Sequence, residues 1–176
     1  MQRVRILFSA FAIVLALLLT TACGGSSQSA SSTPSPTPTP TPHVAHAGQS
    51  ADQLLQGLKS HGLPVGVSFT YTAANDLNHL LGRPGQYIGK VNFKDTRITG
   101  YGQGANISVS DGGSIEVFAN TTDAKKRFAY LQALSKSGVG LFAEYEYLDG
   151  VVILRISNQL TPDQAAQYQA ALKTLP

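Results

Sequence analysis

The stretch Ala143–Ser157, AEYEYLDGVVILRIS, decides the fold predicted for this chain. Ala143–Leu148 and Val151–Ser157 flank the pair Asp149-Gly150. Asp and Gly in succession suit the positive φ angles of a tight type I′ turn, so the stretch predicts a β-hairpin. The sheet of this protein therefore contains at least one antiparallel pair.

Amphipathic helices are predicted on both sides of this hairpin. After it, Thr161–Gln164 combines a capping residue, a proline at the first helical position and a glutamine three residues after the cap. Before it, Asn120–Asp123 offers capping side chains for a helix that stops at Gly138. The inward-facing residues are Ala124, Phe128, Leu131 and Leu134 in the earlier helix, and Ala165, Tyr168, Leu172 and Leu175 in the later one.

The N-terminal half of the domain predicts one helix and several strands. Ser50 and Gln53 form a capping box for a helix over Ala51–His61, and Pro64 prevents its continuation. Alternating apolar residues predict strands at Val65–Thr72, Tyr87–Lys94 and Ser114–Ala119. The glycine-rich stretch 99–113 is expected to be a loop around a short strand at Ile107–Ser110.

These elements define an α+β fold, with an antiparallel or mixed sheet and about three helices packed on one face. Residues 49–176 are expected to form a single domain that is long enough to bury a core of its own. The chain has one cysteine, so no disulfide can form within it and core packing must hold the domain together.

Residues 1–22 are predicted to be a secretion signal peptide. Arg3 and Arg5 precede the apolar run Ile6–Leu19, and small residues lead from there to Cys23. The run is shorter than the roughly 18 residues that a spanning helix needs, so a permanent transmembrane anchor is the weaker interpretation.

This signal together with the stretch Cys23–Ser27, CGGSS, resembles the lipobox of bacterial lipoproteins. The resemblance implies cleavage before Cys23 and attachment of a diacylglyceryl group to its thiol. That anchor would hold the protein at the outer face of the bacterial cytoplasmic membrane, because two acyl chains bind stably where one does not. Thr20 stands where the family usually has Leu, so cleavage at Ala22 without lipidation is the alternative.

Residues 23–48 carry no hydrophobic periodicity and are predicted to be a disordered tether after the lipidated cysteine. Proline alternates with Ser and Thr from Pro34 to Pro42, a composition that favours extended polyproline II and buries little apolar surface. His43 and His46 are expected to be solvated. A proline-rich ligand for a partner, or sugar attachment to the threonines, is the alternative role of this segment.

The charge balance argues against nucleic acid as a partner. The net charge is +3, but Arg3 and Arg5 lie in the signal segment, which leaves 11 basic against 10 acidic residues. A surface that binds nucleic acid needs a clustered basic face.

The sequence holds no motif for catalysis, metal binding or cofactor binding. It has no Gly-x-Ser-x-Gly, Ser-x-x-Lys, His-Glu-x-x-His or P-loop pattern, so no cofactor or metal is predicted. The candidates for an enzymatic site are His79 with Asp76, and Glu144 with Glu146 on one strand face. The alternative for the two glutamates is a solvated strand face, with the intervening tyrosines pointing into the core.

The candidate binding loop is the densest cluster of polar residues, between positions 75 and 87. Its hydrogen-bonding and charged members are Asn75, Asp76, Asn78, His79, Arg83 and Tyr87. Binding residues are often carried on loops that a rigid scaffold holds. The alternative is that Asp76 pairs with Arg83 and only stabilises the loop.

The same loop carries a second resemblance. The stretch 75–84, NDLNHLLGRP, together with Ser114–Phe118 and Leu160–Ala165, is similar to small, uncharacterised secreted bacterial lipoproteins over about residues 51–175. That family implies the compartment and the single domain, but no activity.

Together these features predict a membrane-anchored extracytoplasmic lipoprotein whose domain is a binding or accessory module of the cell envelope. The partner is predicted to be an envelope protein, a glycan or a small solute. An extracytoplasmic hydrolase-type enzyme and a structural or inhibitor-like protein are the alternative functions.

Overall fold

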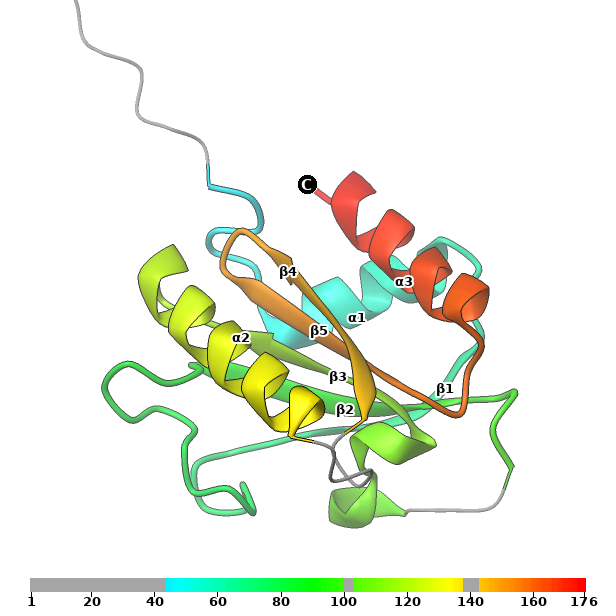
Figure 1. Ribbon diagram of the computed structural model, residues 1–176, viewed down its shortest axis with the longest axis horizontal. Coiled ribbons are helices and arrows are strands. Elements are labelled where there is room, and N and C mark those ends of the chain that lie inside the picture. The colour runs from blue at the N-terminus through cyan, green and yellow to red at the C-terminus, as the bar shows by residue number, and fades with distance from the viewer. Residues whose placement is uncertain (1–43, 100–102, 138–142) are drawn as a thin grey trace, which may run out of the picture. The chain divides into compact units, whose positions relative to one another are not determined.

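The helices and strands follow one another in an order that confirms the predicted α+β class (Figure 1). The computed structural model describes residues 44–99, 103–137 and 143–176. The helices are α1 (Ala51–Ser60), α2 (Thr121–Lys136) and α3 (Pro162–Thr174). The strands are β1 (Val65–Thr70), β2 (Gly89–Asp95), β3 (Gly112–Val117), β4 (Glu144–Asp149) and β5 (Val152–Ser157), and two 3₁₀ turns, η1 (Gly104–Asn106) and η2 (Val109–Asp111), precede β3.

The five strands form one sheet in the order β1-β2-β3-β5-β4, and every pair is antiparallel. The chain leaves β3 through α2 and returns as the β4–β5 hairpin, in which β5 takes the place next to β3. β1 and β4 are therefore the edge strands, and β5 lies inside the sheet.

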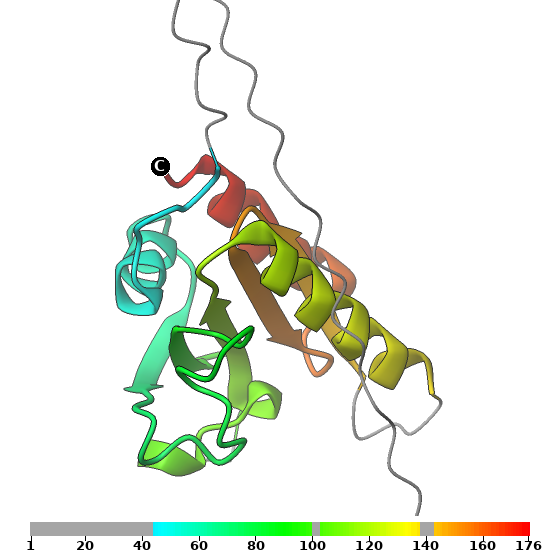
Figure 2. The same cartoon turned by 90° about the vertical axis from the view of Figure 1, so that its left-hand side faces the viewer.

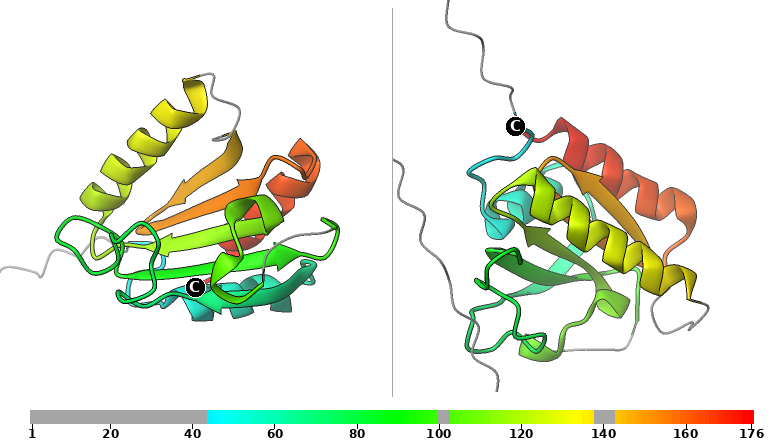
Figure 3. Two further views of the ribbon diagram at one scale, coloured as in Figure 1. Left: turned by 90° about the horizontal axis from the view of Figure 1, so that it is seen from below. Right: turned by 60° about the vertical axis from the view of Figure 1, so that its left-hand side comes forward.

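The helices cover both faces of the sheet. α1 and α3 pack against one face over the main hydrophobic core, whereas α2 packs against β4 and β5 from the other side (Figures 2 and 3). The expectation that the helices share one face therefore holds for α1 and α3 but not for α2. α2 lies on the other face because of β5, where Val152, Ile153 and Leu154 are all buried. Both faces of this strand are therefore apolar, and each has to be covered by a helix.

Capping side chains begin α1 and α3 as predicted. The Ser50 amide donates to Gln53 Oε1 at 2.8 Å, and the Gln53 amide donates to Ser50 Oγ at 3.2 Å. Thr161 and Gln164 exchange the same two hydrogen bonds at the start of α3. Each box satisfies amides that the first turn of a helix leaves without partners.

The predicted hairpin forms, but its turn lies one residue later than expected. Asp149 pairs with Val152, so the loop residues are Gly150 and Val151, and only Gly150 has a positive φ, of +56°. The expected type I′ turn is therefore wrong, since it needs a positive φ at both loop residues. Any side chain at Gly150 would also collide with the carbonyl oxygen of Ala45, which packs over the turn.

The packed part of the chain begins before residue 49. The Val151 amide donates to the Ala45 carbonyl at 3.4 Å, and His46 is only 3% exposed. The His46 ring nitrogens lie 3.2 Å from the Pro176 carbonyl oxygen and 3.4 Å from Asp149 Oδ2. The expectation that His46 is solvated is therefore wrong, because these acceptors hold the ring in the domain. His43, Cys23 and most of the predicted tether lie outside the described residues.

A predicted short strand at residues 107–110 is not formed, because this segment folds into η2. Asp111 Oδ2 accepts hydrogen bonds from the Ser108 amide at 2.7 Å and from the Ser108 hydroxyl at 2.8 Å. Side chains of this kind compete with strand pairing for backbone amides and favour a turn.

Candidate functional site

One face of the sheet is polar where α2 does not cover it. Asn92 on β2 pairs with Ser114 on β3, which pairs with Arg155 on β5, so the three side chains form a row on one face. Their chain neighbours Val91 and Leu154 belong to the main core on the opposite face. The strands therefore alternate between an apolar face and a polar one.

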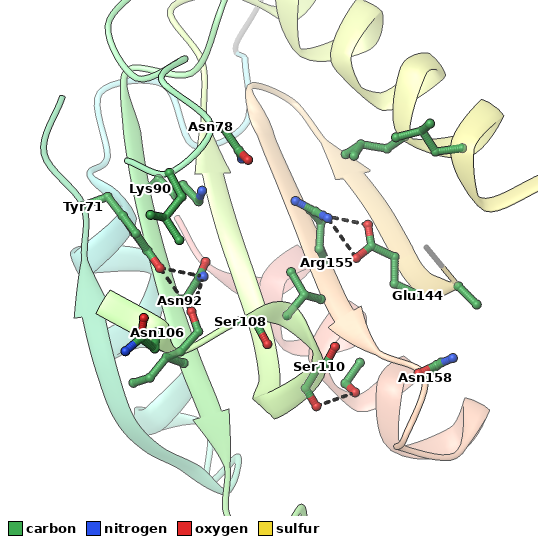
Figure 4. A pocket seen from close by; sticks show the side chains of 17 residues that line it. Tyr71, Asn78, Lys90, Asn92, Asn106, Ser108, Ser110, Glu144, Arg155 and Asn158 are labelled. Carbon is green, nitrogen blue, oxygen red and sulfur yellow. Dashed lines mark hydrogen bonds and ion pairs between the residues drawn. The ribbon is translucent and has the colours of Figure 1, made fainter. Parts of the chain in front are cut away.

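A pocket of about 290 Å³ opens over this row, and we call it the basin (Figure 4). Lys90 and Asn92 stand on one wall, and Arg155 with Glu144 stands on the other. The neutral polar lining residues are Tyr71, Asn78, Asn92, Asn106, Ser108, Ser110, Ser157 and Asn158. The apolar lining residues are Leu77, Ile107, Val109, Leu131, Leu134 and Ala143.

Glu116 organises the ion pairs beside the basin. Its fully buried carboxylate accepts hydrogen bonds from Arg127 Nε at 2.9 Å, from Arg127 Nη2 at 3.0 Å and from Arg155 Nη1 at 3.0 Å. Arg155 also donates two hydrogen bonds to Glu144, at 2.7 and 3.0 Å. Burial alone would raise the pKa of Glu116, but the Arg127 hydrogen bond and the two arginine charges outweigh it and lower that pKa. Glu116 is thus ionised at neutral pH.

Asp76 forms a second buried centre. Its Oδ2 accepts hydrogen bonds from the Tyr87 hydroxyl at 2.6 Å and from the amides of Leu80 and Leu81 at 3.0 and 3.1 Å, while its Oδ1 accepts from Lys90 Nζ at 2.9 Å. Burial would raise the pKa of Asp76, but these donors and the Lys90 charge hold it well below its usual range. Burial and the bond to Asp76 raise the pKa of Tyr87. Asp76 therefore fixes Lys90 on the wall of the basin.

The structure divides the candidate binding loop into two groups. Asp76 and Tyr87 are fully buried, so they belong to the scaffold. The exposed members are Asn75, Asn78, His79 and Arg83. Of all six residues, Asn78 alone lines the basin.

The alternative interpretation of this loop, in which Asp76 pairs with Arg83, is wrong. Asp76 pairs with Lys90 on β2, whereas the side chain of Arg83 is exposed and makes no ion pair with a described residue. The reason is burial: the loop turns the Asp76 carboxylate inward, onto the polar face of the sheet. The exposed imidazole of His79 is likewise not joined to the buried Asp76 carboxylate, so these two side chains are not assembled as the enzymatic hypothesis requires.

Glu144 and Glu146 lie on the α2 side of the sheet, half-buried. Glu146 accepts a hydrogen bond from Ser135 Oγ at 2.6 Å. Burial raises the pKa of Glu146, the Ser135 hydrogen bond opposes this change, and the Glu144 charge adds to it. The expected solvated face is therefore wrong, because α2 and Arg155 cover these glutamates. Tyr145 and Tyr147 pack against the main core, as predicted.

Two polar atoms of this row have no hydrogen-bond partner among the described residues: Oδ1 of Asn92, which lines the basin, and Oγ of Ser114, which lies between Asn92 and Arg155 in the sheet. Asn92 is 6% exposed and Ser114 is fully buried. The Asn92 amide cannot be turned over, because its nitrogen donates to the Ile107 carbonyl at 2.6 Å and an oxygen there would face another acceptor. Each unsatisfied buried polar group costs about 1–3 kcal/mol, so its presence points to a functional role.

Sequence reasoning missed Lys90, Asn92, Ser114 and Arg155, because it searched a loop and these residues lie on strands. A signal for them exists. Lys90 and Asn92 alternate with Val91 and Phe93 in a predicted strand. Only 13% of the residues in this chain are charged, so a charged residue inside a strand, such as Lys90, is a signal of its own. Such a polar strand face is ordinarily read as solvent-exposed, which concealed the basin.

Within residues 44–99, 103–137 and 143–176, no group of three or more His, Cys, Asp or Glu is placed to hold a metal ion. No helix in these ranges combines the length and the apolar character needed to cross a bilayer. No protein-family model, curated protein or solved structure matches this chain. The resemblance to small secreted lipoproteins therefore stays a prediction, and function has to be inferred from the site.

Proposed function

We propose that this protein is a lipid-anchored, extracytoplasmic binding module of the bacterial cell envelope that holds a small polar solute in the basin. The observation that carries the proposal is a pocket of about 290 Å³ beside two buried polar atoms that have no partner among the described residues, one on the lining residue Asn92 and one on its strand neighbour Ser114. Small-molecule sites are concave, begin at volumes of about 300 Å³ and combine apolar walls with a few placed polar groups. A pocket of this kind favours a small solute over a protein partner.

The sequence before the domain supports the location. Cys23 with its preceding apolar run favours a diacylglyceryl anchor, and the chain between Cys23 and Val44 is rich in Pro, Ser and Thr. In polyproline II, at ~3.1 Å per residue, such a tether reaches up to about 60 Å from the membrane.

The position of the basin in the domain also supports this proposal. The β4–β5 register places Asp149 and Val152 at one end of the hairpin and Glu144 and Ser157 at the other. The Val44–Gln49 turn packs at the first end, and the basin lies at the second. At roughly 3.3 Å per residue, the strand separates them by about 17 Å. The basin thus lies away from the point where the tether joins the domain.

A thermal-shift panel on the mature full-length chain tests the binding. The probes are sugars, amino acids, organic acids and polyamines. Ser110→Trp fills the basin from an exposed wall position, and Ser60→Trp is the matched control on α1, across the sheet. We expect at least one class of solute to raise the melting temperature of the wild type and of Ser60→Trp but not of Ser110→Trp. The binding proposal is overturned if no class does so.

Membrane fractionation tests the anchor separately. Cys23→Ser should release the protein from membranes or leave its precursor unprocessed, because a serine oxygen cannot form the thioether. Mass spectrometry of the wild type should find a lipid on Cys23. A processed N-terminus without lipid, or Cys23→Ser protein that is processed and still membrane-bound, would contradict the anchor.

A further inference from the structure

We propose that the basin takes a neutral, hydroxyl-rich ring, such as a sugar or a cyclic polyol, in preference to an ion. This inference rests on the proposed function and adds the chemical class of the solute. It follows from three observations: the charged side chains that line the basin are already paired, the free groups on its rim are carboxamides, and the unpartnered buried atoms of Asn92 and Ser114 are oxygens.

The charged side chains around the basin neutralise one another. Of the residues that line it, Lys90, Arg155 and Glu144 are charged, and each is held in an ion pair. Each cation is engaged at 3.0 Å or less by a carboxylate that is almost fully buried. A bound anion would have to compete with these carboxylates for their partners, and a bound cation would find no free carboxylate among the lining residues, because Arg155 holds Glu144. Neither charge is favoured.

The accessible rim offers neutral groups that donate and accept at once. Asn106 and Asn158 line the basin and are exposed, and neither carboxamide has a hydrogen-bond partner among the described residues. A carboxamide presents a carbonyl acceptor and two N–H donors, which matches a hydroxyl that also does both. Leu131 and Leu134 from α2 give the same basin an apolar wall, which suits the C–H face of a ring.

The two unpartnered oxygens of the polar row can both accept a hydrogen bond. Asn92 Oδ1 can only accept, and Ser114 Oγ can accept or donate, so hydroxyl groups of a ligand satisfy both. The side chains around them cover both oxygens in this structure, so a ligand hydroxyl reaches them as those side chains shift.

Titration calorimetry on the mature full-length chain tests the class of solute. The neutral probes are D-glucose, D-galactose, N-acetyl-D-glucosamine and myo-inositol, and the matched charged probes are glucose 6-phosphate and glucosamine. We expect at least one neutral ring to bind with a Kd of about 1 mM or below, and its charged analogues to bind about tenfold more weakly. A short chitin oligosaccharide, compared with free N-acetyl-D-glucosamine, shows whether the ring is taken as a free solute or as the end of a glycan.

Variants identify the groups that bind the ring. Asn106→Ala and Asn158→Ala should each weaken binding several-fold without changing the melting temperature, whereas Gln56→Ala, an exposed amide on α1, should change neither. Ser114→Ala should have opposite effects on the two readouts. It should raise the melting temperature of the free protein, since it removes an unsatisfied hydroxyl, and it should weaken the binding of the ring.

Three results would overturn the inference: no neutral probe binds at about 10 mM or below, a charged analogue binds at least as tightly as its neutral parent, or affinity is unchanged in Ser114→Ala and in both asparagine variants. If a charged solute binds and Ser110→Trp abolishes that binding, the proposed function holds and the neutral class is wrong. If nothing in the wider panel binds, the proposed function itself is wrong.

Discussion

Replacing Glu116 with Gln should destabilise the domain by about 3 kcal/mol. Removing one partner of a buried ion pair typically costs about 3–5 kcal/mol, because a buried charge loses its counter-charge. Here Arg155 keeps its two hydrogen bonds to Glu144, and Arg127 lies on the surface helix α2 with a side chain that is 10% exposed. Arg127 can therefore turn toward water, which places the cost at the lower end of that range. A domain with a stability of about 5–15 kcal/mol loses a large part of it.

Equilibrium urea unfolding, followed by far-UV circular dichroism on the mature full-length chain, measures this loss. With a slope of about 2 kcal/mol per molar urea, the midpoint should fall by about 1.5 M. Asp163→Asn is the control, because that carboxylate is exposed at the start of α3 and its contribution is about 0.3–1 kcal/mol. A loss below about 1 kcal/mol for Glu116→Gln would refute its role as the buried, ionised centre of the polar face.

Three other perturbations test the packing and the electrostatics. Phe128→Ala should lower the stability of the domain by about 1–2 kcal/mol, less than the roughly 3–5 kcal/mol of a fully buried Phe, because this ring is half-buried. The control Lys125→Ala should lower it by under about 0.5 kcal/mol. Equal losses of stability in denaturant melts would contradict the orientation of α2. His46→Ala should lower the melting temperature by a few degrees, since a buried ring loses its contacts with Asp149 and Pro176; an unchanged value would place residues 44–48 outside the folded domain. Acid should destabilise the domain, because Asp76 and Glu116 have lowered pKa values in the folded state. The stabilisation that these two carboxylates give is complete above about pH 4.5 and is lost as the pH falls through their folded-state pKa values. A melting temperature that stays constant from about pH 5 to pH 2 would count against both ion pairs.

The sequence predicts the features of the fold that depend on near neighbours. The capping boxes at Ser50 and Thr161 need a glutamine three residues later, and both partners can be read from a few letters. The hairpin is predicted for the same reason, although its turn moves by one residue because Asp149 pairs in the strand. Near neighbours in the sequence do not determine which face of the sheet α2 covers, because that depends on the burial of β5 between β3 and β4.

The basin could not be predicted, because its residues meet only through the sheet. Arg155 reaches Glu116 across 39 positions of sequence, and Lys90 reaches Asp76 across 14. Polar residues are dense in the candidate binding loop, yet the Asp76 carboxylate turns inward and stabilises the scaffold. A polar residue such as Asn92, in a strand where apolar and polar residues alternate, is ordinarily expected to face solvent. The three-dimensional structure shows instead that residues of η1, η2 and α2 line the basin together with Asn92.

The binding of a solute in the basin is tested most directly by mapping it residue by residue. The measurement is a ¹H–¹⁵N NMR titration of the mature chain carrying Cys23→Ser, with the solute that gives the largest shift in the thermal panel. The backbone amides that change should lie around the basin, on β2, β3 and β5 near Asn92, Ser114 and Arg155, and on η1 and η2. Changes confined to α1 and α3, on the opposite face of the sheet, would contradict the basin as the binding site, and so would a spectrum that does not change.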